Sequence, residues 1–161
     1  MPSPRSAAQR AKSKGIPPAP KDLASIDFSV LETPTRRIFD SIVVADKDSG
    51  IVIFGTETTM TEFVESKVKS MDGTFRIAPK LYYQVLIIMA MVSGTFIPCF
   101  FVLLPSKTRD IYNRLFMLLS HAMVVQGHRA DFRDHHVMCD FEHALRAAFK
   151  VEKLYIQRLQ I

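Results

Sequence analysis

The chain is poor in cysteine, has no tryptophan and lacks the motifs of several common enzyme classes. Its two cysteines, Cys99 and Cys139, stand in apolar runs, where a thiol usually behaves as a small buried hydrophobic group. This usage excludes a disulfide-rich secreted scaffold and favours a reducing compartment. The sequence has no glycine-rich phosphate loop, Gly-x-Ser-x-Gly elbow or His-Glu-x-x-His helix. Nucleotide hydrolysis, serine hydrolysis and zinc proteolysis therefore have no support.

The N-terminus also lacks a continuous apolar stretch, which argues against a secretory signal. Residues 1–22 instead carry a net charge of +4 and five of the nine prolines, whereas residues 23–161 carry a net charge of only +1. We therefore expect a disordered basic arm over 1–22 and a folded domain over 23–161. The arm is suited to neutralising DNA phosphates. The alternatives are a solvated terminus or a nuclear localisation signal. The expected location is the nucleus or the cytoplasm.

The domain contains enough apolar residues for one hydrophobic core, since 48% of the chain is hydrophobic and 23% is charged. The runs 42–45 and 51–54 are rich in β-branched residues and flank a turn-prone insert, so they predict a hairpin or two adjoining strands. Residues 59–64 predict a short helix that Thr59 or Thr61 caps.

Residues 67–78 alternate between apolar and polar side chains, which predicts a strand. The apolar face is expected to hold Met71, Phe75 and Ile77, and the polar face Asp72, Thr74 and Arg76.

Residues 81–105 form an uncharged run of 25 residues. A membrane helix needs ~20 apolar residues, so this run is long enough to be one. It also contains Ser93, Gly94 and Pro98 and many β-branched and aromatic side chains. Two buried strands over 82–92 and 96–104, joined by a glycine turn, are therefore favoured over the membrane helix.

An amphipathic helix capped by Thr108 should follow. Its expected apolar stripe is Ile111, Leu115, Leu118, Ala122 and Val125. A short strand over 137–139 and a second helix that begins at Phe141 complete the pattern. The fold class is therefore α/β, with three consecutive strands followed by a helix, a strand and a helix.

Two aspartates are candidate metal ligands in this layout. Asp72 lies on the polar face of its strand, and Asp140 ends the strand after the first long helix. If these strands are neighbours, the two carboxylates face each other across about 4.8 Å. Such a pair suits Mg²⁺, which takes one or two carboxylates together with waters and substrate phosphates. The alternatives are an Asp-Gly turn at Asp72 and a helix N-cap at Asp140.

Four segments of the sequence carry a resemblance to a known family: IVIFGTETTMTEFVES, MDGTFRIAPKLYYQV, IPCFFVLLPSKTRDIYNRLF and CDFEHALRAAF. In this order they resemble the transposase domain of Mutator-like elements (MULE). That family has an Asp-Gly-Thr-Phe strand, an aromatic-Gln pair, an apolar strand that ends near Lys-Thr, a Tyr in the next helix and an Asp-Phe-Glu string. The resemblance covers roughly residues 26–151.

The resemblance implies a ribonuclease-H-like fold with a DDE-type site that binds Mg²⁺ or Mn²⁺. Asp72 and Asp140 match the family's first two catalytic aspartates, while Glu142 matches a recurrent position that we do not assign as a ligand. Gly73 should permit a close approach of chain or substrate. Arg76 and Lys80 are candidate DNA contacts, with a solvated strand edge as the alternative.

The resemblance is incomplete at the C-terminus. The family's third carboxylate, a Glu, lies well downstream, and the acidic residues after Asp140 here are Glu142 and Glu152. We therefore expect a partial domain without the C-terminal elements, weak metal binding, no strand transfer by this chain alone and self-association through an exposed sheet edge.

The histidines suggest a further, weaker alternative. His135, Cys139 and His143 are evenly spaced, but a structural zinc site usually has four ligands in paired short spacings. The histidines are therefore expected on the surface or in contact with a ligand-bearing residue.

Overall fold

The computed structural model describes residues 20–23, 25–26, 42–129, 135–139 and 143–149. The strands are β1 (Ile42–Asp46), β2 (Ile51–Phe54), β3 (Val68–Thr74), β4 (Gln84–Val92), β5 (Thr95–Leu104) and β6 (His136–Cys139). The helices are α2 (Glu57–Glu65) and α3 (Arg109–Val125), and residues 143–149 are also helical. Most of the expected basic arm lies outside these ranges, as do Phe141 and the expected helical residues beyond 149.

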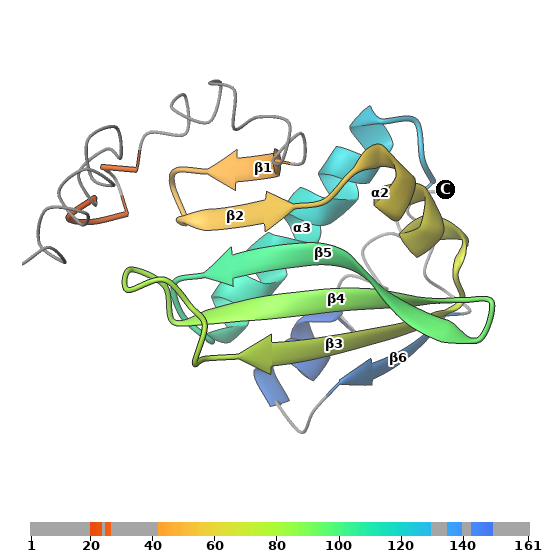
Figure 1. Ribbon diagram of the computed structural model, residues 1–161. Coiled ribbons are helices and arrows are strands. Elements are labelled where there is room, and N and C mark those ends of the chain that lie inside the picture. Colours follow the sequence, from red (N-terminus) through yellow and green to blue (C-terminus); the bar gives the residue numbers. More distant parts are fainter. Residues whose placement is uncertain (1–19, 24, 27–41, 130–134, 140–142, 150–161) are drawn as a thin grey trace, which may run out of the picture.

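The six strands form one sheet in the order β1-β2-β5-β4-β3-β6 (Figure 1). All neighbouring pairs are antiparallel except β3 and β6, which run parallel. The chain reaches β6 through α3, which passes behind the sheet in Figure 1. The predicted α/β class and the predicted order of elements are confirmed.

The uncharged run 81–105 is a hairpin of β4 and β5. Ser93 and Gly94 form its two-residue turn with φ of 50° and 82°, the positive values that a tight hairpin turn requires. Pro98 lies beside a bulge in the pairing of β5 with β4, where a strand tolerates a missing N–H. The membrane-helix alternative for this run is wrong. No helix among the described residues is long and apolar enough to cross a membrane.

Helix capping differs between the two long helices. Thr108 caps α3 as predicted, by accepting a hydrogen bond from the Ile111 N–H. The N-cap of α2 is Thr56, and neither Thr59 nor Thr61 takes that place. Thr59 instead completes a capping box, because its hydroxyl accepts from the Thr56 N–H while the Thr56 hydroxyl accepts from the Thr59 N–H.

The core lies between one face of the sheet and the described helices. Phe100 of β5 contacts Phe63 of α2 edge to face at 5.2 Å, and Phe116 of α3 contacts Phe149 in the same way at 5.4 Å. The strand side chains of this face are buried, among them Ile51, Ile53, Met71, Leu86, Ile88, Ala90, Phe100, Val102 and Leu104.

Two predicted apolar faces need correction. Phe75 and Ile77 are exposed, because β3 ends at Thr74 and the chain then turns, with the Phe75 carbonyl accepting from the Ala78 N–H. On α3, Val125 is exposed at the end of the helix. The buried face of α3 is Tyr112, Leu115, Phe116, Leu119, Ala122 and Met123, since the two aromatic residues bring the largest apolar area to the sheet.

Candidate functional site

The strand of Asp72 and the strand that leads to Asp140 are direct neighbours. In the parallel pairing of β3 with β6, Val68 lies opposite His136 and Met71 lies opposite Cys139. The described register therefore stops one residue before each aspartate. Asp140 and Glu142 themselves lie outside the described residues.

Asp72 lies inside β3, opposite Ile87 of β4, and its side chain is exposed. The Asp-Gly turn considered for this position is therefore wrong. Because strand side chains alternate, Asp72 shares its face with Ser70 and Thr74, on the opposite side from buried Met71. Asp72 forms no ion pair with any described residue. A carboxylate flanked by two hydroxyl-bearing residues is an oxygen-rich environment of the kind that hard divalent cations prefer.

Gly73 permits a close approach, as expected, but a core side chain makes it. A Cβ at Gly73 would lie 2.9 Å from Oε1 of Gln84, which is fully buried in β4. The Gln84 Nε2 donates a hydrogen bond to the Tyr112 hydroxyl of α3 at 2.5 Å, while Oε1 has no hydrogen-bond partner in the described part of the chain. Gly73, Gln84 and Tyr112 thus form a buried contact that joins β3, β4 and α3 beneath Asp72.

This contact links three motifs that carry the family resemblance. Gly73 follows Asp72 in the Asp-Gly-Thr-Phe string, Gln84 belongs to the aromatic-Gln pair, and Tyr112 is the tyrosine of the next helix. Sequence reasoning singled out each motif but did not predict that their side chains meet. The position of Gln84 within an apolar strand did indicate that its side chain meets another polar group, because a buried amide needs a hydrogen-bond partner.

A buried lysine was missed altogether. Lys69 of β3 is fully buried, donates to the Ser66 carbonyl, and lies 2.7 Å from Nδ1 of His135 and 4.6 Å from the ring centre of Phe63. The sequence did indicate this burial, because side chains two residues apart in a strand share a face and Lys69 lies two residues before the apolar Met71.

His135 therefore lies against the buried Lys69 side chain, and His143 is exposed on the last described helix. Within the described ranges, no three His, Cys, Asp or Glu side chains are grouped closely enough to hold a metal ion. Burial raises the pKa of the Cys99 thiol to about 11, so this cysteine is a protonated core side chain at neutral pH.

Arg76 and Lys80, the candidate DNA contacts, are both exposed. They lie in the connection from β3 to β4 and not on a strand edge, because the strand ends at Thr74. This connection leaves the sheet at the same end as Asp72, three or more residues further along the chain. The structure therefore presents both basic side chains to solvent near the C-terminal end of β3.

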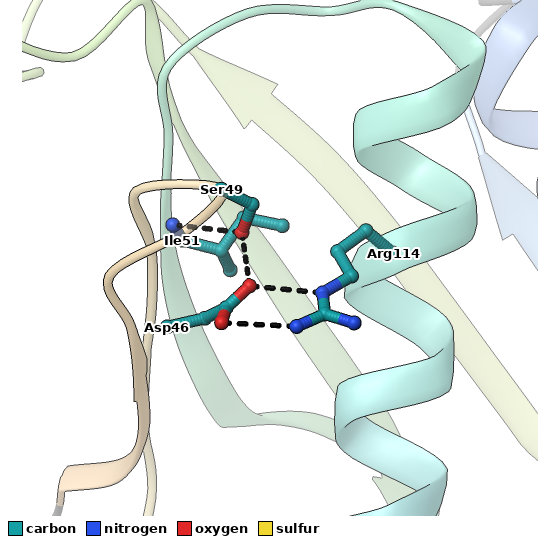
Figure 2. A network of polar contacts seen from close by, with 4 residues as sticks. All are labelled: Asp46, Ser49, Ile51 and Arg114. Atoms are coloured by element: carbon teal, nitrogen blue, oxygen red, sulfur yellow. Dashed lines mark hydrogen bonds and ion pairs between the residues drawn. The ribbon is translucent and has the colours of Figure 1, made fainter.

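An ion pair fixes the β1–β2 hairpin to α3 (Figure 2). The Arg114 guanidinium donates to both carboxylate oxygens of Asp46, at 2.9 and 3.0 Å, and the Ser49 hydroxyl donates to the same carboxylate at 2.5 Å. The Arg114 hydrogen bond is the main cause that lowers the pKa of Asp46 to about 2. This pair is structural, since it joins two elements on the helix side of the sheet.

Comparison of the chain with models of protein families, with curated proteins and with solved structures finds no match. The resemblance to Mutator-like transposases therefore rests on the motif residues described above.

Proposed function

We propose that this chain is a transposase-related DNA-binding domain of ribonuclease-H-like fold, in which Asp72 and Asp140 together bind Mg²⁺ or Mn²⁺. The observation that carries the proposal is the parallel pairing of β3 with β6. The last described pair joins Met71 to Cys139, and the next residue in the chain is Asp72 on one strand and Asp140 on the other.

The strand order supports the fold assignment. β3, β4 and β5 are consecutive antiparallel strands, and the chain then crosses through α3 to β6 on the other side of β3. The resemblance implies this succession of three strands, a helix and a strand. The β1–β2 hairpin adds two strands beyond β5.

Asp72 is suited to metal binding because it is exposed and forms no ion pair with a described residue. A bound Mg²⁺ would activate a water or a 3′ hydroxyl for attack on a phosphodiester. With two carboxylates and no third ligand assigned, we expect weak binding of the ion and no strand transfer by this chain alone.

A non-catalytic DNA-binding or protein-binding domain is the second candidate. Exposed Arg76 and Lys80 favour DNA over a protein partner, and their contribution to binding does not depend on a metal ion.

Mn²⁺ binding and plasmid nicking test the proposal on the full chain. We expect electron paramagnetic resonance to detect Mn²⁺ bound to the wild type, and we expect Asp72→Asn and Asp140→Asn each to abolish that binding. Asp48→Asn, at an exposed turn, is the matched control and should leave it unchanged. Equal Mn²⁺ binding by all four proteins would overturn the metal site. Nicking that requires Asp72 would support catalysis, and DNA binding without nicking at any divalent ion concentration would support the second candidate.

A further inference from the structure

Exposed aromatic and basic side chains gather at the end of the sheet where β3 stops. They are Phe75, Arg76, Lys80, Tyr83 and Lys107, and we call them the aromatic-basic patch. The first four lie in the connection from β3 to β4, and Lys107 lies between β5 and α3. The two connections are adjacent because the Tyr83 N–H donates to the Leu104 carbonyl at 2.8 Å.

The two aromatic rings of the patch contact each other and remain exposed to solvent. Phe75 and Tyr83 pack edge to face with their ring centres 5.4 Å apart, yet they remain 51% and 44% exposed. The Lys107 ammonium lies 5.6 Å from the ring centre of Tyr83. A mutually positioned pair of exposed rings with an adjacent cation offers π faces at a low cost in side-chain entropy.

The two connections carry charge of one sign, and the exposed acidic residues Asp72 and Asp110 lie just outside them. Residues 75–83 and 105–109 contain four basic residues, Arg76, Lys80, Lys107 and Arg109, and no acidic residue. All four side chains are exposed, and none is in an ion pair with a described residue. The patch therefore complements an anionic polymer that also has flat aromatic groups.

We propose that the aromatic-basic patch binds single-stranded DNA, with an unpaired base stacked on Phe75 and the neighbouring cations on its phosphates. Stacking on aromatic side chains beside a basic groove is how proteins hold single strands without reading sequence. The inference rests on the proposed DNA binding and specifies its substrate class. Phe75 follows Asp72 by three residues, which is about 10 Å along an extended chain. The patch would thus hold an unpaired strand close to the proposed metal site.

Fluorescence measurements on the full chain test this inference. A single-stranded oligonucleotide that contains 2-aminopurine should bind with quenched fluorescence, because stacking quenches this base. We expect Phe75→Leu to weaken binding by about 5- to 10-fold and to restore fluorescence, while the dependence on salt stays the same. Lys107→Gln should instead reduce the slope of log affinity against log salt by about 0.7.

Phe101→Leu is the matched control, because Phe101 is 44% exposed but lies in the middle of the sheet, on β5. It should bind the oligonucleotide like the wild type. Tyr83→Phe, which keeps the ring, should also bind normally. Equal quenching by Phe75→Leu and the wild type would overturn the inference, as would equal affinity for a blunt duplex or equal competition by polyglutamate. All titrations contain EDTA, so failure of the proposed metal site cannot be mistaken for failure of the patch.

Discussion

Asp72 and Gly73 are adjacent in the chain but act on opposite sides of the sheet. Asp72 is exposed on the face of the sheet that no described helix covers. Gly73 makes room for the buried Gln84 side chain on the opposite face, which packs against the helices. The Tyr112 hydroxyl holds the other end of that amide. At the scale of single residues, the Asp-Gly pair thus combines a candidate ligand with a packing site that positions its strand.

Gly73→Ala should therefore lower the free energy of unfolding by about 1–3 kcal/mol, because the added Cβ overpacks a buried contact. Urea denaturation measures the change. The same substitution in a Gln84→Ala background should cost almost nothing, since the colliding amide is gone. An equal loss in both backgrounds would contradict the assigned contact.

The β1–β2 hairpin is an element whose position depends on electrostatics as well as packing. Ile51 and Ile53 bury one side of β2, and the Asp46–Arg114 pair ties the turn end of the hairpin to α3. The pKa of Asp46 is lowered from 3.8 to about 2, so the folded state favours the charged carboxylate. The stabilisation is thus present above about pH 4 and is lost as the pH falls toward about 2.

Asp46→Asn should consequently lower the melting temperature by about 2–4 °C near neutral pH, and the difference from the wild type should vanish as the pH approaches about 2. Circular dichroism melts at a series of pH values check this. Asp48→Asn in the same turn should have a smaller effect. A difference that stays constant down to the lowest pH would show that the ionised carboxylate is not the cause.

The whole molecule is a layered structure whose described helices all pack on one side of the sheet. On the other side, Phe101 and Met138 are 44% and 49% exposed. Met138 lies in β6, the last strand of the sheet, and no described strand pairs with the outer edge of β6. An exposed strand edge beside apolar side chains favours pairing with a second chain.

We therefore expect an apparent mass that rises with protein concentration in size-exclusion chromatography with light scattering. Met138→Lys should reduce this association, since a charged side chain disfavours edge-to-edge pairing. Met117→Lys, at a position 45% exposed on α3, is the matched control and should associate like the wild type. A monomer at every concentration, with a sharp cooperative melt, would contradict the prediction.

The sequence by itself determined the local elements. Period-2 alternation and β-branched runs predicted the strands, Thr108 predicted the start of α3, and Ser93-Gly94 predicted the turn that separates β4 from β5. These features depend on neighbouring residues and are therefore readable from the chain. The predicted boundaries of elements were wrong where a partner distant in the sequence decides where a strand ends. Phe75 is an example, because it follows Thr74, the last residue of β3 that pairs with β4.

Only the tertiary structure decided which segments meet. The placement of β3 between β4 and β6, the contact of Gly73 with Gln84, and the burial of Lys69 against His135 all join residues far apart in sequence. The aromatic-basic patch likewise exists because the folding of β5 against β4 brings Lys107 to Tyr83. Such contacts depend on the closure of long loops and on packing across the sheet, and no local pattern in the chain specifies them.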